Sequence, residues 1–236
     1  MSEVSENYKH ILDRIERACS VSGRDPEDIL FLGVTKTVDC EKISEALECG
    51  IKAIGENRVQ EFLEKYDRLK EREIAFHLIG HLQTNKVKYI ADKVDMIESV
   101  DSIKLLREID LQAGKCGRKM DCLVELNVCK EPSKFGLMPE RLEEFLSEAA
   151  SFQNVSIRGL MAIPPVCTDE KTQRSIFSEL YQIFVDIRDK KIDNINMDYL
   201  SMGMSLDYDY AIMEGANIVR IGTALFGKRE TKVEGV

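Results

Sequence analysis

A lysine at the end of an apolar run has the clearest potential for covalent chemistry in this sequence. Lys36 ends the stretch ILFLGVTK, which has the composition of a buried strand. Partial desolvation at a strand end favours the neutral amine, and a neutral amine attacks aldehydes. The alternative is a lysine that simply extends its amine from the strand end into water. Taken alone, Lys36 is equally compatible with both interpretations.

Two stretches near the C-terminus carry the groups of an anion site. LSMGMSLD offers backbone amides near Gly203 and Met204, the hydroxyl of Ser205 and the start of a helix, whose dipole attracts negative charge. RIGTALFG adds Gly222 and Thr223, which supply a second backbone approach and a second hydroxyl. Each stretch alone is a weak signal. Together they predict a site for a phosphate group.

An arginine lies close to the second of these stretches. Arg220 precedes Gly222 by two residues, so on a strand both would face the same way. An arginine that faces inward needs a partner. A pyridine nitrogen would accept its hydrogen bond and would stay unprotonated beside a permanently charged guanidinium. An ion pair across the protein interior, with Glu125 as the candidate carboxylate, is the alternative.

Further polar residues follow the second and third apolar runs. In GENR, Asn57 could point its amide into a pocket while also capping the next helix, and capping alone is the favoured interpretation. In FHLIGHLQTNK, His77 and His81 have the i, i+4 spacing of some zinc ligands. Gly80 breaks the segment and no third ligand is apparent, so hydrogen-bonded interior residues are the preferred interpretation. Lys134, in NVCKEPSKFGL, belongs either to a solvated loop or to the rim of a site.

These polar residues lie at the C-terminal ends of predicted strands, in a sequence that alternates strands and helices. An opening helix covers about residues 4–20. The strand candidates are residues 29–36, 53–56, 76–79, 96–100, 122–128, 157–163, 199–202 and 218–222. The helix candidates lie near residues 40–49, 58–70, 84–91, 102–114, 139–151, 170–189 and 208–215, and no eighth helix is clear.

Eight such units favour a single (β/α)8 barrel with an extra N-terminal helix. A doubly wound sheet is the alternative, but no Gly-x-Gly-x-x-Gly follows the first strand. A chain of 236 residues is a normal length for one barrel domain, here residues 1–236 with a polar tail, KRETKVEGV. In a barrel the C-terminal strand ends meet at one face. The polar residues named above would therefore meet there.

Composition excludes several classes of protein. The net charge of −9 disfavours a nucleic-acid surface, and no apolar run is long enough for a membrane span. The seven cysteines contain no Cys-x-x-Cys pair, so we expect reduced thiols. The N-terminus lacks a secretory signal pattern, and the expected location is the cytoplasm.

As an ordered set, the motifs resemble one family, the YggS/PROSC group of pyridoxal phosphate homeostasis proteins. The matching stretches, from about residue 5 to about residue 228, are GVTK, GENRVQE, HLIGHLQTNK, NV…SKFGL, GLMAI, LSMGMSLD and VRIGTALFG. Cys129 departs from the pattern, because the family often has a small residue there. The resemblance implies a fold-type III pyridoxal phosphate barrel, like the barrel domain of alanine racemase.

The resemblance also assigns roles to individual residues. Lys36 would hold pyridoxal 5'-phosphate (PLP) as a Schiff base, and Arg220 would face the pyridine nitrogen. The remaining implied cofactor contacts are Ser205, Gly222 and Thr223 at the phosphate, with Asn57 and Met202 as further pocket residues. No catalytic residue is implied, because family members are regarded as acting in vitamin B6 homeostasis without a demonstrated reaction.

Three functions are compatible with these residues. The first is a monomeric binding protein that buffers PLP, takes other B6 vitamers as further ligands and passes PLP to apo-enzymes. The second is a PLP-dependent amino-acid racemase, which needs a second acid/base that we expect this chain to lack unless Tyr208 or His81 serves. The third is an aldolase-like barrel that uses Lys36 on a sugar phosphate without a cofactor.

Overall fold

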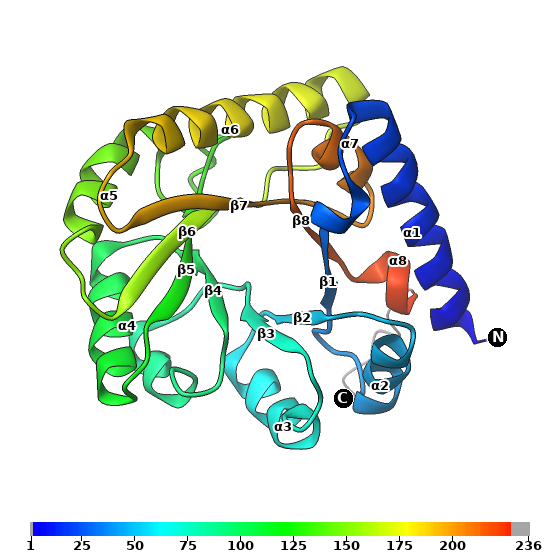
Figure 1. The fold of residues 1–236 in the computed structure, drawn as a ribbon, viewed down its shortest axis with the longest axis horizontal. Coiled ribbons are helices and arrows are strands. Elements are labelled where there is room, and N and C mark those ends of the chain that lie inside the picture. The colour runs from blue at the N-terminus through cyan, green and yellow to red at the C-terminus, as the bar shows by residue number, and fades with distance from the viewer. Residues whose placement is uncertain (1, 228–236) are drawn as a thin grey trace, which may run out of the picture.

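The computed structural model describes residues 2–227, and the predicted polar tail lies outside the described residues. Within this range eight parallel strands form a closed barrel in chain order, and β1 pairs with β8 to close it (Figure 1). The strands are β1 (Leu30–Val34), β2 (Ala53–Glu56), β3 (Ala75–Leu78), β4 (Met96–Val100), β5 (Met120–Leu126), β6 (Val155–Ala162), β7 (Ile195–Met204) and β8 (Ile218–Ile221). The predicted (β/α)8 barrel is confirmed.

Helices surround the ring of strands (Figure 1). The α-helices are α1 (Glu3–Ser22), α2 (Cys40–Glu48), α3 (Val59–Leu69), α4 (Ile103–Lys115), α5 (Leu142–Ala149), α6 (Glu170–Lys190), α7 (Tyr208–Met213) and α8 (Thr223–Phe226). Three 3-10 helices, η1 (Pro26–Asp28), η2 (Thr84–Tyr89) and η3 (Pro139–Arg141), complete the described elements. The extra N-terminal helix is confirmed as α1, which lies outside the barrel beside α7 and α8 (Figure 1).

Besides shifts in the bounds of several elements, such as β7, which is longer than the predicted residues 199–202, three differences from the prediction matter most. β1 ends at Val34, so Lys36 lies in a turn two residues beyond the strand. Residues 84–89 form a 3-10 helix where an α-helix was predicted. An eighth helix, α8, follows β8 but has only four residues, too few to show a helical period in the sequence.

Side-chain caps determine where several helices begin. The carboxylate of Asp39 accepts a hydrogen bond from the Lys42 amide at the start of α2, and Asp169 accepts one from the Thr172 amide at the start of α6. Ser102 serves α4 in the same way. These caps satisfy amides that have no partner within their own helix, so each helix starts soon after the preceding strand.

Buried apolar side chains form two layers. The larger layer lies between the strands and the helices, and the smaller one includes Leu32, Val34, Met161 and Ile218. Because alternate strand residues face opposite sides, Leu32 and Val34 point into the barrel while Phe31 packs outward. Among residues 2–227, no helix combines the length and the apolar composition that crossing a bilayer requires.

Candidate functional site

One cavity lies at the C-terminal ends of the strands. It has a volume of about 640 Å³, within the range of small-molecule sites. Its apolar lining includes Val34 at the end of β1, Ile79 after β3, Ile163 after β6 and Met204 at the end of β7. Six of the seven site residues predicted from the sequence also line it, namely Lys36, Asn57, Ser205, Arg220, Gly222 and Thr223. The barrel thus brings together groups that are up to 187 positions apart in the chain.

The seventh residue, Met202, lies elsewhere. Its side chain is fully buried in the layer between the barrel and the helices, and it does not line the cavity. Its neighbour Ser201 faces the barrel interior, where its hydroxyl contacts Glu98 and Arg220. Since neighbouring strand residues point to opposite faces, Met202 points outward. Any influence of Met202 on the cavity is exerted through packing.

The serine after β7 joins the two segments that were predicted to form the anion site. Ser205 Oγ accepts hydrogen bonds from the amides of Gly222 and Ala224, both at 3.2 Å. Those amides are at the start of α8, where the side chain of Thr223 is exposed. Amides and hydroxyls therefore converge at this end of the cavity, as an anion requires.

Two glycines allow the backbone to pass closely at this face. Gly203 has φ +89°, and a Cβ there would lie 2.5 Å from the Cβ of Ala211 in α7. Glycine at this position lets the end of β7 turn tightly against α7, which places Ser205 beside Gly222. A Cβ on Gly80 would meet the backbone oxygen of Asn57 at 2.4 Å, so Gly80 lets the end of β3 lie against Asn57.

Arg220 is buried inside the barrel and reaches the floor of the cavity. Its guanidinium donates hydrogen bonds to Ser201 Oγ at 2.5 Å and to the Ala162 carbonyl at 2.7 Å. Ser201 in turn donates to Glu98 Oε2 at 2.6 Å, and Glu98 Oε1 lies 2.6 Å from His77 Nδ1. This polar chain crosses the interior from β8 to β3 and holds the guanidinium at the cavity.

The alternative sequence interpretation paired Arg220 with Glu125. The hydrogen bonds of Arg220 go instead to Ser201 and Ala162, and Glu125 acts on it only through its charge. Burial lowers the pKa of Arg220, while Glu98, Glu125 and Asp207 oppose this shift. A guanidinium remains protonated under these conditions. The cavity therefore has a fixed positive charge at its floor.

The carboxylates beside Arg220 differ in charge state. Burial alone would raise the pKa of Glu98, but its contacts with His77, Arg220 and Ser201 together outweigh burial, and the net pKa is lowered. Burial raises the pKa of Glu125 to about 7, and the negative charge of Asp101 adds to the rise. Glu98 is thus ionised at neutral pH, whereas Glu125 is close to half protonated.

Asn57 faces the cavity and does not cap α3. Arg58 occupies the N-cap position of α3, and no side chain caps that helix. Asn57 lines the cavity, and its Oδ1 atom is buried without a hydrogen-bond partner among the described residues. A buried amide oxygen without a partner is costly, so this atom marks a place where a ligand donor would be favourable.

The other polar residues of the sequence analysis lie outside this cavity. His77 is the hydrogen-bonded interior residue described above, while His81 lies 3.3 Å from Asp101 and stacks on Phe135. Among residues 2–227, no group of three or more His, Cys, Asp or Glu side chains is arranged to hold a metal ion. Lys134 pairs with Glu131 at 3.1 Å and lines a second, smaller cavity of about 240 Å³.

Comparison with known proteins identifies the family. The family model "Alanine racemase, N-terminal domain" matches residues 11–230. A protein of Aquifex aeolicus, named pyridoxal phosphate homeostasis protein, is 44% identical over 225 residues, which cover 95% of this chain and 98% of that protein. The chain belongs to the pyridoxal phosphate homeostasis protein family. The resemblance seen in the motifs is confirmed.

Solved structures of similar proteins agree with this family assignment. A structure described as an unknown protein from Bifidobacterium adolescentis superposes with a TM-score of 0.88 at 34% identity, covering 95% of this chain and 97% of the other. PipY of Synechococcus elongatus, solved with PLP bound, gives a TM-score of 0.80 at 32% identity, covering 91% and 100%. The barrel is therefore shared with solved structures of similar length.

The sequence analysis did not predict that α1 contributes to the cavity. Glu3 and Asn7 line the cavity, and the Asn7 amide group donates to the Leu225 carbonyl of α8 at 3.0 Å. Both residues precede residue 11, where the match to the family model begins. No local pattern in an amphipathic helix shows that its first turn lies at a site more than 200 residues away. Only the closed fold places it there.

Proposed function

We propose that this chain binds PLP in the described cavity, holds it as a Schiff base on Lys36, and serves as a reservoir of the cofactor within vitamin B6 homeostasis. The observation that carries the proposal is the convergence in one cavity of a primary amine, an anion site and a buried arginine. PLP is a pyridine ring with one aldehyde and one phosphate. These three groups match its three recognisable parts.

The residues present fit this ligand. The cavity has room for a molecule of this size, with apolar walls for a ring. Ser205 and the first amides of α8 converge where a phosphate would be bound, and Arg220 supplies a donor deep in the barrel. The buried Asn57 Oδ1 has no protein partner among the described residues, so it could accept a hydrogen bond from the ligand.

Each residue then has one task. PLP supplies an aldehyde, which condenses reversibly with a primary amine. Lys36 provides that amine at the partly buried mouth of the cavity. Ser205, Gly222 and Thr223 orient the phosphate, while Arg220 donates toward the ring nitrogen and disfavours its protonation. The apolar walls reduce access of water to the reactive carbon.

The reservoir role includes three finer proposals. The mouth of the cavity has exposed apolar side chains, Val166 and Leu206, which supports a transient contact with apo-enzymes that receive PLP. Because the anion site lies apart from Lys36 in the cavity, B6 vitamers that lack the phosphate could still bind there, but more weakly than PLP. We also propose that the chain acts as a monomer, because its own residues supply an amine, an anion site and a buried arginine for the ligand, and that it acts in the cytoplasm.

Borohydride reduction tests the proposed lysine. The purified protein is loaded with PLP, reduced, digested and analysed by mass spectrometry, and the label is expected on the peptide that contains Lys36. Lys36→Ala should lose the label, and Lys134→Ala should keep it. A label on Lys134 in the wild-type protein, or unchanged PLP affinity in Lys36→Ala, would show that the amine lies elsewhere. Absence of any bound PLP would favour the aldolase-like alternative.

A further inference from the structure

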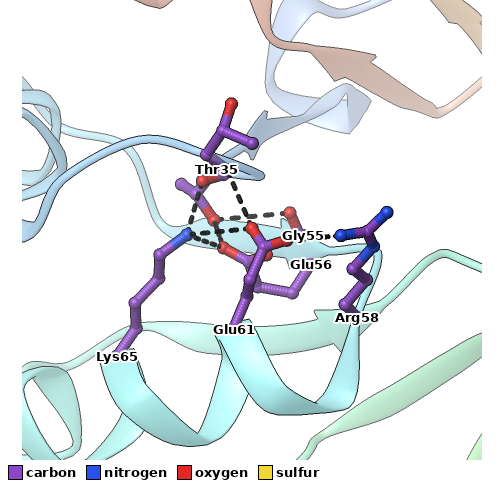
Figure 2. Close-up of polar contacts among 7 residues, drawn as sticks. Thr35, Gly55, Glu56, Arg58, Glu61 and Lys65 are labelled. Carbon is purple, nitrogen blue, oxygen red and sulfur yellow. Dashed lines mark hydrogen bonds and ion pairs between the residues drawn. The ribbon is translucent and has the colours of Figure 1, made fainter. Parts of the chain in front are cut away.

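Two charged side chains of α3 contact the backbone on either side of Lys36, and the proposed function assigns neither of them a task. Figure 2 shows Glu61 and Lys65 projecting from α3 toward the loop that carries Thr35. Glu61 ends the motif GENRVQE, and Lys65 follows it one helical turn later. Both contacts join residues that lie 24 or more positions apart.

The first contact is made by Lys65. Its Nζ donates to the carbonyl of Thr35 at 2.6 Å and lies 2.5 Å from Glu56 Oε1, while Thr35 Oγ1 donates to the same carboxylate oxygen at 2.5 Å (Figure 2). Lys65 and Glu56 are both buried. A buried ion pair of this kind contributes little net stability, because both charges lose their hydration. Its position against Thr35 indicates a different role.

The second contact is made by Glu61. Its Oε2 accepts a hydrogen bond from the Thr37 amide at 2.8 Å, whereas its ion pairs to Arg58 and Lys65 are longer, at 3.9 and 4.0 Å. Thr37 has φ +62°, a left-handed conformation that is unfavourable for a β-branched residue. Such a conformation persists only where the surroundings hold it.

Together these contacts fix the Lys36 turn, defined here as residues 35–38. The Val38 amide closes the turn on the Thr35 carbonyl at 3.0 Å, the same carbonyl that Lys65 contacts. Lys36 occupies the second position of this turn, between a carbonyl held by Lys65 and an amide held by Glu61. Its side chain then lines the cavity.

We propose that Glu61 and Lys65 are positioning residues for Lys36, because they hold the Lys36 turn in the strained conformation that directs the amine into the cavity. The inference rests on the proposed function for the task of that amine. The contacts that Glu61 and Lys65 make with the Lys36 turn are present in the structure without any ligand. The proposal therefore predicts an effect on the free protein as well as on PLP affinity.

Glu61 gives the sharpest test, because its side chain is partly exposed and its replacement should leave the fold intact. Glu61→Ala should speed hydrogen exchange of the Thr37 amide in the PLP-free protein and weaken PLP binding about tenfold, as expected for loss of one charge-assisted hydrogen bond. Glu61→Gln retains an acceptor oxygen and should stay close to wild type. Glu64→Ala, an exposed change on the same helix, is the matched control.

A second variant separates positioning from simple stability. Thr37→Gly removes the cost of positive φ, so adding Glu61→Ala to it should weaken PLP binding much less than in the wild-type background. For Lys65, the pair Lys65→Met with Glu56→Gln avoids an unpaired buried charge and should also weaken binding about tenfold while circular dichroism is unchanged. Wild-type affinity in that double variant would remove Lys65 from the proposal.

Unchanged Thr37 exchange and PLP affinity in Glu61→Ala, or equal effects of Glu61→Ala in the two Thr37 backgrounds, would overturn the proposal. Failure of the proposed function gives a different result. In that case Lys36→Ala binds PLP like the wild type, while exchange at Thr37 in the PLP-free protein still reports whether Glu61 holds the turn.

Discussion

At the scale of single residues, Ser205 has two acceptor bonds whose donors, the Gly222 and Ala224 amides, would also suit a phosphate. Its hydroxyl therefore keeps the two segments of the anion site together and can donate to a phosphate oxygen itself. Thr223 adds an exposed hydroxyl on the same side. We therefore expect Ser205 to contribute more than Thr223 to the binding of a phosphate.

We predict that Ser205→Ala with Thr223→Ala weakens PLP binding by about a hundredfold or more, because hydrogen bonds to a charged group contribute about 1.5–3 kcal/mol each. Titration with PLP and with pyridoxal, which lacks the phosphate, measures this. Binding of pyridoxal should change little in the same variant. If PLP and pyridoxal lose affinity equally, the hydroxyls do not contact the phosphate.

Glu125 is a second residue with a measurable property of its own. Its pKa is raised from the model-peptide value of 4.5 to about 7 by burial and by Asp101. The unfolded chain releases this proton near pH 4.5, while the folded chain keeps it until about pH 7. The folded state therefore binds more protons in this window, and its stability should decline as pH rises from 4.5 to 7.

We predict that Glu125→Gln removes this decline, which amounts to about 3 kcal/mol for a shift of this size. Urea unfolding of the PLP-free protein at about pH 5 and about pH 7.5 gives the two free energies. An exposed change, Glu64→Gln, serves as the control. The assignment of the raised pKa to Glu125 fails if wild type and Glu125→Gln show the same change in free energy between the two pH values.

At the scale of elements, the turn from β7 into α7 depends on Gly203. A side chain there would have to adopt φ +89° and would also approach Ala211. We predict that Gly203→Ala lowers the free energy of unfolding by about 1–3 kcal/mol and weakens PLP binding, since Ser205 follows this turn.

Gly117→Ala is the matched control for this prediction. Gly117 also has positive φ, +65°, but a Cβ there would meet nothing within 4 Å. It should show only the cost of the backbone conformation, and PLP binding should be unchanged. Equal destabilisation by the two alanine variants would mean that the approach of α7 to Gly203 contributes nothing.

Most elements could be predicted from the sequence because their signals are local. The apolar runs identify the eight strands, and the residues at their C-terminal ends identify most of the cavity. The proposed phosphate end could be predicted because Ser205 and Gly222 lie in the loops after β7 and β8 of a barrel. Alternation along β7 predicts that Met202 points outward. The end of β7 is irregular at Gly203, however, so the sequence alone does not show how far this alternation continues.

Other features could not be predicted because they depend on long-range contacts. β1 ends at Val34, and the Lys36 turn that follows it is held by side chains of α3. Nothing in ILFLGVTK itself predicts these contacts. The sequence favoured a capping role for Asn57, but the closed barrel places Asn57 at the cavity and Arg58 at the N-cap. The chain from Arg220 through Ser201 to Glu98 joins three strands whose order along the barrel must be known first.

At the scale of the whole molecule, the proposed reservoir function predicts that the cavity retains its ligand without turning it over. Among the described residues that line it, Lys36 is the one primary amine and Glu3 the one carboxylate, and none is His, Tyr or Cys. Inversion of an amino acid needs a proton acceptor and a proton donor on opposite faces of the reacting carbon. In the proposed binding mode, Arg220 would also disfavour protonation of the ring nitrogen, although alanine-type racemases tolerate an arginine there. The organisation of residues 1–236 as a single domain stays a prediction.

We predict that the PLP-loaded protein does not invert the common L- or D-amino acids over multiple turnovers. Incubation in deuterated water, followed by chiral chromatography and mass spectrometry, measures inversion and α-proton exchange together. Alanine racemase provides the positive control. Sustained inversion that disappears in Lys36→Ala would establish the racemase alternative.

The closure of the barrel by β1 and β8 has a consequence for how the protein is made. Lys36 follows the first strand, while Gly222 and Thr223 follow the last, and the two ends of the site meet only when β1 pairs with β8. A chain still growing on the ribosome has Lys36 long before it has the phosphate site. Since a ligand stabilises only the state that binds it, PLP can support the finished barrel but none of its shorter precursors.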